Sequence, residues 1–189
     1  TSFLVKPINT LGALGSYNLR QETFTEALAI SGEEMHSRYH ARDTTCLKCP
    51  VACGKQYEIR DGELAGIKAK MPEYETIFAF GSMLGNAHAG SLAKANDLCD
   101  LLGMDTITMG VTLSFVAEAL ERGWLAPDEI GVPFGWGDWR GMLRLIEMTA
   151  AREGFGDRLA EGGWRLAESV HPEATKTVYA VKRLELPAH

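Results

Sequence analysis

One segment of the sequence is apolar on nearly all sides, and it limits the folds that the chain can adopt. The segment runs from Thr106 to Arg122 and contains Ile107, Val111, Leu113, Phe115, Val116 and Leu120. A helix that lacks a polar face lies inside a core, where other elements cover it. Gly123 is expected to end the helix. The segment therefore predicts a buried helix within the core of the domain.

The remaining helical patterns are shorter or amphipathic. Ser31 and Glu34 form a capping box, which predicts a helix that runs through Tyr39. Residues 138–152 carry apolar side chains at the spacing of an amphipathic surface helix. Further helices are expected at 23–30, at 72–80 with Pro72 in the first turn, at 91–102 with Gly103 as its end, and at 157–170. Residues 1–15 are rich in Gly, Pro and Asn and predict a loop.

Two segments favour β-structure. Residues 55–60 and 63–70 flank Asp61-Gly62, a dipeptide typical of a two-residue hairpin turn. Residues 177–181 are rich in β-branched and aromatic side chains and predict a strand. The fold class expected from these patterns is mainly α, a multi-helix domain with a small β-hairpin.

Composition excludes several classes of protein. The 189 residues contain 19 Lys and Arg against 25 Asp and Glu, a formal net charge of -6. This balance argues against a protein that binds nucleic acid through a basic face. No apolar run approaches the roughly 18 residues that a membrane span needs, so no membrane partner is expected. The chain starts without Met or a signal peptide, and we expect it to be part of a longer protein.

Three of the four cysteines lie within eight residues, in the pattern Cys46-x-x-Cys49-Pro50-x-x-Cys53. Thiolates are soft ligands that select iron–sulfur clusters, zinc or copper(I). Three close cysteines with one distant partner are typical of a [4Fe–4S] cluster, whereas a Cys₄ zinc site more often uses two separate Cys-x-x-Cys pairs. A cluster is favoured, and zinc or unligated thiols remain alternatives. Cys99 lies within a predicted helix and is expected in the core, so a fourth ligand would come from elsewhere.

The charge around the cysteines is positive. Residues 36–60 contain five Lys or Arg and two Asp or Glu, within a chain that is acidic as a whole. Nearby cations would stabilise an anionic, thiolate-ligated cluster. A solvated loop explains the same charges equally well.

A second motif, Asp100-x-x-Gly103-x-Asp105, lies between two predicted helices. Gly103 can end the first helix and Asp105 can cap the second, so both have a purely structural explanation. Asp100 does not, because the helix dipole disfavours a negative charge near a C-terminus. A ligand rich in hydrogen-bond donors would justify a carboxylate there, and the edge of a pterin is such a ligand.

With these motifs in place, the sequence resembles the tungsten-containing aldehyde:ferredoxin oxidoreductase family. The resemblance runs through nearly the whole chain, and each piece by itself is weak. The pieces are Asn18-Leu19, the cysteine motif with Gly54, Pro72-Glu73-Tyr74-Glu75-Thr76, the Asp100 motif with Thr106, Gly154-Phe155-Gly156-Asp157, Leu159-Ala160-Glu161-Gly162, and Leu184-Glu185-Leu186-Pro187-Ala188.

The resemblance implies roles for individual residues. Cys46, Cys49 and Cys53 would ligate a [4Fe–4S] cluster. Asp100, Gly103 and Asp105 would match the family's first pterin-binding motif, although Leu is usual where this chain has Met104. Glu75 would be the acidic residue near the metal and the catalytic candidate, with Glu73 as an alternative.

The resemblance also implies a domain organisation. Residues 1–189 would form the central helical domain of a larger enzyme, similar to domain 2 of the family. The N-terminal pterin-binding domain and the C-terminal helical domain would lie outside them. The fourth cluster cysteine, a second pterin motif and the pocket histidine would also lie elsewhere, so this part alone is expected to be inactive.

The implied activity is the oxidation of small aldehydes to carboxylic acids at a tungsten or molybdenum bis-pterin. Electrons would pass through the cluster to ferredoxin or a similar acidic carrier in the cytoplasm, and a homodimer is compatible with the resemblance. Two alternatives remain open. One is a structural zinc module or helical interaction domain, with His40 or Cys99 as the fourth ligand. The other keeps the scaffold but reduces aromatic thioesters.

Overall fold

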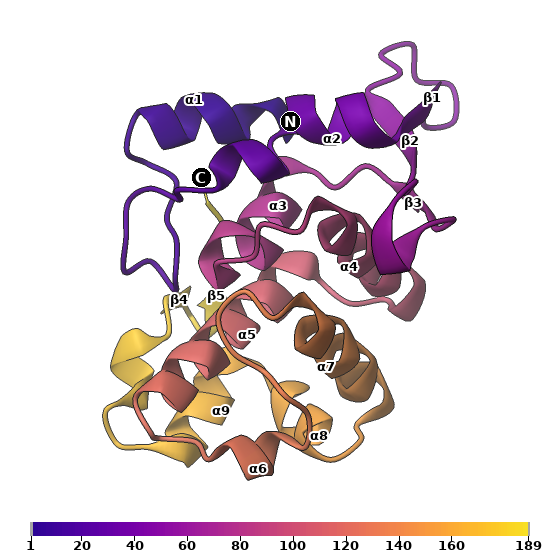
Figure 1. Ribbon diagram of the computed structural model, residues 1–189. Coiled ribbons are helices and arrows are strands. Elements are labelled where there is room, and N and C mark those ends of the chain that lie inside the picture. Colours follow the sequence, from indigo (N-terminus) through magenta and orange to yellow (C-terminus); the bar gives the residue numbers. More distant parts are fainter. Residues whose placement is uncertain (1, 189) are drawn as a thin grey trace.

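The apolar segment of the sequence forms helix α5 (Thr106–Glu121), which runs through the middle of the molecule in the computed structural model (Figure 1). The structure describes residues 2–188. Every residue of α5 from 109 to 119 is buried, as the absence of a polar face predicts. Asp105 caps the helix by accepting a hydrogen bond from the backbone N–H of Thr108. Gly123 follows α5 with a positive φ of 71°.

Helix α3 (Tyr74–Phe80) packs against α5 at very short range. A Cβ atom at Gly110 would lie 2.7 Å from the carbonyl carbon of Ala79, so only a glycine lets the two backbones approach this closely. Helix α3 starts later than predicted, and Pro72 precedes it rather than lying in its first turn. The reason is that Met71 still donates a backbone hydrogen bond to Lys55 O, which keeps the chain extended at this point.

Two longer helices lie on the same side of the core. Helix α4 (Ala89–Leu102) begins after His88, whose ring nitrogen accepts a hydrogen bond from the Ser91 N–H, and it ends at Gly103 in the left-handed conformation. Helix α7 (Trp139–Ala151) begins at Asp138, which caps it with its carboxylate. Both predicted helices are confirmed.

The N-terminal third contains more helix than the sequence suggested. Residues 1–15 were expected to form a loop, but η1 (Ser2–Leu4) and α1 (Val5–Thr10) lie there. Pro7 is tolerated because it occupies the first turn, where backbone N–H groups lack helical partners. The 23–30 pattern forms only a short 3-10 turn, η2 (Ala27–Ile30). The start of α2 (Gly32–Tyr39) at Ser31 is confirmed, since the Ser31 hydroxyl accepts from the Glu34 N–H. The second bond of a capping box is not formed, because the Ser31 N–H donates to Leu28 O instead of the Glu34 carboxylate.

A three-stranded antiparallel sheet follows α2. Its strands β1 (His40–Thr44), β2 (Gly54–Glu58) and β3 (Lys68–Lys70) lie in the order β1-β2-β3. The pairing of β2 with β3 confirms a hairpin, but the Asp-Gly turn was wrong, because η3 (Gly62–Leu64) lengthens the connection. Strand β1 was not predicted, since its residues are mostly polar and exposed.

As far as residue 188, the C-terminal part contains two more helices than predicted. Instead of a single helix at 157–170, α8 (Phe155–Leu159) and α9 (Gly163–Val170) are separated at Gly162, whose φ of 84° breaks the helical path. The strand expected at 177–181 is shorter. The remaining elements of this part are α6 (Pro127–Ile130), η5 (Ala174–Thr177), β4 (Ala180–Val181) and β5 (Leu184–Glu185). Earlier in the chain, the short 3-10 turn η4 (Ser82–Leu84) lies between α3 and α4.

A buried polar network ties both ends of the chain to α5. Asn18 is fully buried, and its amide donates to the carboxylate of Glu118 at 2.6 Å and to Thr177 O at 2.9 Å. Arg122 neutralises Glu118 through a bond of 2.7 Å from Nε. Tyr17, Asn18 and Leu19 all have positive φ, which is rare for residues with side chains. The network offsets the cost of this conformation, because it satisfies the buried amide and carboxylate.

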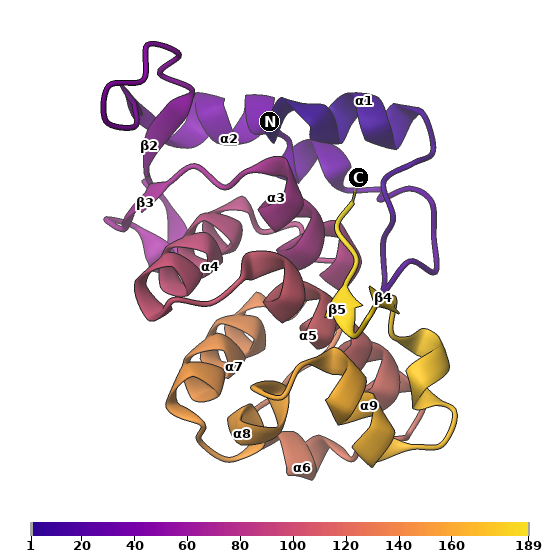
Figure 2. The ribbon, with the colours of Figure 1, turned by 180° about the vertical axis from the view of Figure 1, so that it is seen from behind.

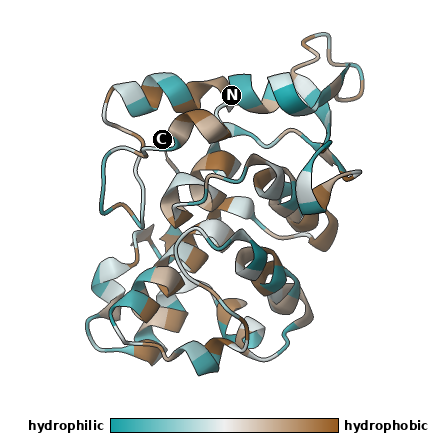
Figure 3. Ribbon diagram, in the orientation of Figure 1, coloured by the Kyte–Doolittle hydropathy of each residue, from teal (hydrophilic) through white to brown (hydrophobic). Residues whose placement is uncertain are grey.

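The distribution of apolar residues agrees with this arrangement. Outer helices such as α2 and α7 carry hydrophilic and hydrophobic residues side by side, whereas the middle of the molecule is richer in hydrophobic ones (Figure 3). Within residues 2–188, every helix falls short of the length and apolarity that crossing a bilayer would need.

The contact between α3 and α5 generates a prediction. Replacing Gly110 with Ala should lower the free energy of unfolding by about 1–3 kcal/mol, because the added methyl group meets the Ala79 backbone. Gly135→Ala is the matched control, since a Cβ there would meet no atom within 4 Å. Chemical denaturation would measure both variants, and equal stability of the two would contradict the close packing.

Candidate functional site

The cysteine motif forms the loop between β1 and β2. At the neck of this loop, Asp43 and Lys55 lie opposite each other and form an ion pair of 3.0 Å. The hydrogen bond from Lys55, and then that from His40, lower the pKa of the Asp43 carboxyl. Gly54 lies opposite Thr44, where a Cβ atom would come within 2.5 Å of the Thr44 hydroxyl. A glycine directly after the last cysteine therefore lets the strands close the loop.

The loop projects from one corner of the molecule (Figures 1 and 2). The Cys49 N–H donates to Cys46 O at 3.0 Å, which folds the first Cys-x-x-Cys segment into a turn. The hydroxyl of Thr45 donates to the carbonyl of Cys49. Cys46 and Cys53 are exposed and Cys49 is half-buried. All three thiols thus lie in one loop that a further ligand can reach from outside.

The donor set fits an iron–sulfur cluster by its chemistry, since three soft thiols lie close together in the sequence and are accessible. The geometry is not that of a closed metal site. Among residues 2–188, no group of three His, Cys, Asp or Glu side chains is arranged to hold a metal ion. The structure therefore places the three predicted ligands in one loop without bringing their sulfur atoms together.

Cys99 is separate from this loop. It is fully buried in α4, as the sequence predicted, and burial raises the pKa of its thiol to about 12, with Asp100 and Asp105 adding to the effect. A thiol of this kind is a poor metal ligand, because thiolate is the form that binds metal. The other ligand of the zinc alternative, His40, directs its Nε2 atom to the carboxylate of Asp43 at 3.0 Å.

The second predicted motif lies where α4 ends and α5 begins. Gly103 has the left-handed conformation of a helix end, and Asp105 caps α5, so both structural roles are confirmed. Asp100 is exposed, and the amide of Asn96 lies 3.5 Å from its carboxylate. The neighbouring Leu101 is 74% exposed. The junction thus presents carboxylates and apolar side chains on the surface.

A set of hydrogen bonds joins this junction to α3. The hydroxyls of Thr76 in α3 and Thr106 in α5 lie 2.9 Å apart. The Thr76 hydroxyl also lies 3.4 Å from Oδ1 of Asn96 in α4. Since Glu75 directly precedes Thr76, these bonds hold the predicted catalytic carboxylate and the Asp100–Asp105 motif in one framework.

Glu75 is half-buried beneath the last residues of the chain. Its Oε2 atom accepts a hydrogen bond of 2.8 Å from the backbone N–H of Ala188. The segment after β5 therefore lies beside the start of α3, as Figure 2 shows. Glu73, the alternative candidate, is also half-buried and occupies the N-cap position of α3.

A cavity of about 330 Å³ adjoins the junction. Among its lining residues, Asp105 and Thr108 come from the start of α5, Glu161 from the loop between α8 and α9, and Glu185 from β5. Glu185 is nearly fully buried, and its carboxylate accepts a hydrogen bond of 2.8 Å from the Gly163 N–H. The cavity offers polar groups beside one of the predicted pterin-binding residues.

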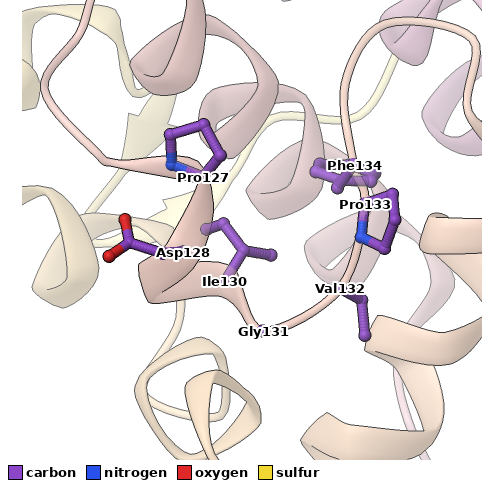
Figure 4. A pocket seen from close by; sticks show the side chains of 7 residues that line it. All are labelled: Pro127, Asp128, Ile130, Gly131, Val132, Pro133 and Phe134. Atoms are coloured by element: carbon purple, nitrogen blue, oxygen red, sulfur yellow. The ribbon is translucent and has the colours of Figure 1, made fainter.

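A larger hollow of about 440 Å³ lies beside α6 (Figure 4). The side chains that line it are mostly apolar, and Asp128 is the charged one among them. None of the residues predicted to bind a metal or cofactor contributes to its wall. We do not regard this hollow as a catalytic site.

Sequence reasoning assigned no role to the polar residues that organise the site, Thr76, Asn96 and Thr106, although Thr76 and Thr106 lie within motifs of the resemblance. They lie on three different helices, and isolated Thr and Asn residues within helices carry no distinctive pattern. The one available signal was proximity, because Thr76 follows Glu75 and Thr106 follows Asp105. Their mutual contacts became visible only once the helices were packed together.

Comparison with known proteins agrees with this arrangement. A family model described as aldehyde ferredoxin oxidoreductase, domains 2 and 3, matches residues 1–189. The tungsten-containing aldehyde ferredoxin oxidoreductase of Pyrococcus furiosus is 42% identical over 193 residues, and that of Thermococcus kodakarensis is 40% identical over 192 residues. Each alignment covers 100% of this chain and 31% of the relative. The chain therefore belongs to the aldehyde ferredoxin oxidoreductase family, and it spans about a third of the length of these relatives.

The fold is also found in a more distant protein. The active site complex BamBC of benzoyl coenzyme A reductase, solved with 1,5-dienoyl-CoA, matches with a TM-score of 0.66 at 22% sequence identity. The match covers 82% of this chain and 23% of that one. At this level of identity the likeness concerns the fold alone.

The burial of the four cysteines yields a prediction. In the reduced, metal-free protein at pH 8, an alkylating reagent should modify Cys46, Cys49 and Cys53 rapidly and Cys99 only after unfolding. Cys99 is buried, and burial raises the pKa of its thiol to about 12, so little of the reactive thiolate is present at that pH. Mass spectrometry would count the adducts. Cys99→Ala should leave the rapid count at three, and four rapid adducts in the unsubstituted protein would contradict the burial of Cys99.

Proposed function

We propose that this chain is the central helical domain of a tungsten or molybdenum oxidoreductase that converts small aldehydes to carboxylic acids. Its 39–42% identity to tungsten-containing aldehyde ferredoxin oxidoreductases supports this activity. The observation that carries the proposal is the framework of Thr76, Asn96 and Thr106, which joins Glu75 to the Asp100–Asp105 junction. A carboxylate for proton transfer and a cofactor-binding motif would then share one rigid support.

The cysteine loop would hold a [4Fe–4S] cluster through Cys46, Cys49 and Cys53. Such a cluster needs four ligands, so the fourth would come from a part of the enzyme outside this chain. The exposure of Cys46 and Cys53 supports this division, because an incoming ligand has access to both. Cys99 cannot take this place, since it lies in the core with a raised pKa.

The helix junction would bind a pterin. A pterin edge presents N–H donors, and carboxylate oxygens are the acceptors that suit them. The exposed Asp100 supplies such oxygens, and Asp105 supplies those that the α5 cap leaves available. Gly103 contributes its left-handed conformation, which turns the chain between the two carboxylates. The remaining pterin contacts would come from domains that lie outside residues 1–189.

When bound, the metal–pterin group would supply the two-electron chemistry that the protein itself lacks. An aldehyde and one water molecule yield a carboxylic acid, two protons and two electrons. Glu75 would accept a proton released in this reaction and pass it to solvent. The hydrogen bond from the Ala188 N–H would help to orient the carboxylate for that task.

The two electrons would leave one at a time through the cluster to a ferredoxin or a similar acidic carrier. A cytoplasmic location is part of the proposal, because a reducing compartment keeps such thiols free of disulfides. The identity of the aldehyde depends on residues outside this chain.

The decisive experiment is metal analysis of the full-length protein, purified without oxygen. We expect tungsten or molybdenum together with about four iron atoms per chain. Cys46→Ser should lose most of the iron and the brown colour, because one of the cluster ligands is removed. Cys99→Ala is the control and should keep both.

Two outcomes would contradict the proposal. Full-length protein that contains neither tungsten nor molybdenum would contradict the proposed aldehyde oxidoreductase activity. A colourless protein with one zinc ion per chain would instead favour the structural zinc module.

The role of Glu75 can be tested separately. Glu75→Gln retains an oxygen that can accept the Ala188 N–H bond but cannot take up a proton, so kcat should fall by about 10²–10⁴. KM and the metal content should change little. Glu73→Gln is the matched control and should stay within about threefold of the unsubstituted enzyme. A larger loss for Glu73→Gln than for Glu75→Gln would assign the role to Glu73.

A further inference from the structure

We propose that the outer face of the β1–β2–β3 sheet, with Arg42, Lys68 and Lys70, is the docking surface for an acidic one-electron carrier protein. We call this surface the basic sheet face. The inference rests on the proposed function, since it names where the electrons would leave the enzyme. It concerns residues to which the comparisons assign no role.

The strand register defines the basic sheet face. Tyr57 and Ala69 are paired neighbours and both are buried, so they mark the inner side of the sheet. Residues one position away point to the opposite side, because side chains alternate along a strand. The outer side therefore carries the paired residues Gln56 and Lys70, Glu58 and Lys68, with Arg42 beside Gln56.

This face has an excess of positive charge within an acidic chain. It holds three cations and one carboxylate, whereas the whole sequence has a net charge of -6. Arg42, Lys68 and Lys70 are all exposed. In the part of the chain that the structure describes, no ion pair neutralises any of the three. By contrast, Lys55 on the inner side is paired with Asp43 at 3.0 Å. Unpaired cations attract an acidic partner over a distance of about 10 Å at moderate salt.

The shape of this face also suits a protein partner. A cavity of about 550 Å³ lies on it, lined by Ala41, Arg42, Gln56, Glu58 and Lys68. It is the hollow in which an acidic side chain of a partner could be seated between the guanidinium of Arg42 and the ammonium of Lys68.

The position of this face links it to the proposed cluster. Strands β1 and β2 belong to the sheet and also hold the two ends of the cysteine loop, which extends from the end of the sheet (Figure 1). A carrier seated on the sheet would therefore lie next to this loop. The loop exposes Leu47 to 91% and Val51 to 71%, next to Lys48. Apolar side chains near a redox centre let a partner protein approach it closely, and the surrounding charges steer that partner toward the site.

The electron balance requires two docking events per aldehyde. Each oxidised carrier gains one electron, and the enzyme loses one electron from the site held by the cysteine loop. Two carriers therefore take up the two electrons that one aldehyde releases. No bond to the carrier forms, so fast binding and release matter more than high affinity.

The remainder of the full-length enzyme is the competing occupant of this face. Should it cover the sheet, Lys68 and Lys70 would be shielded from reagents in the intact protein. Acetylation of the native full-length enzyme, read by mass spectrometry, addresses this directly. We expect Lys68 and Lys70 to react about as fast as the exposed Lys182, and protection of both would overturn the proposal.

The main experiment measures binding of an oxidised, acidic ferredoxin to the anaerobically purified full-length enzyme. The double variant Lys68→Glu, Lys70→Glu should raise the Kd about tenfold at 20 mM salt, and the difference should shrink to below about twofold at 500 mM. Lys182→Glu and Arg183→Glu together form the control of equal charge change, on the hairpin between β4 and β5, and should leave the Kd within about twofold.

Two further readouts separate this inference from the proposed function. Iron content and aldehyde oxidation with a small uncharged dye as acceptor should be unchanged in the double variant at Lys68 and Lys70. If the unsubstituted enzyme contained no iron–sulfur cluster or did not oxidise aldehydes with the dye as acceptor, the proposed function would be refuted. Intact dye activity with an unchanged ferredoxin Kd in the double variant would refute the docking surface alone.

Discussion

The close contact between α3 and α5 supports the rest of the structure. Gly110 allows the backbone of α5 to lie directly against Ala79, and a larger residue would force the two helices apart. The hydrogen bond between the hydroxyls of Thr76 and Thr106 joins the same two helices, and it fixes the position of α3 relative to the N-terminal end of α5. Because Glu75 belongs to one helix and Asp105 caps the other, this contact sets the geometry of the candidate site.

The ends of the chain reinforce this arrangement. Asn18, from the N-terminal part, bonds to Glu118 in α5 and to the carbonyl of Thr177, so it joins three distant segments. The last described residue, Ala188, reaches back to Glu75. These bonds are buried or half-buried and therefore costly to break, since the polar groups would lose partners without gaining water. The site is thus built on a rigid base.

The cysteine loop and its sheet differ from this base in their exposure. The loop is held at its neck by Asp43 and Lys55, but its tip carries the uncovered side chains of Leu47 and Val51. A redox centre that exchanges electrons with another protein must lie near the surface, whereas a proton-transfer carboxylate benefits from a fixed orientation. The proposed division of labour between the loop and the helix junction follows from this physical difference.

The sequence by itself determined the features that depend on neighbouring residues. Apolar side chains on nearly all sides of residues 106–122 predicted a buried helix. Ser31 and Gly103 marked helix ends. The spacing of the cysteines, together with the other motifs, indicated the family. Only the tertiary structure decided the pairing of β1 with β2 and the bonds of Asn18 and Thr76. These depend on contacts between residues far apart in the chain, and local propensity and periodicity carry no information about such partners.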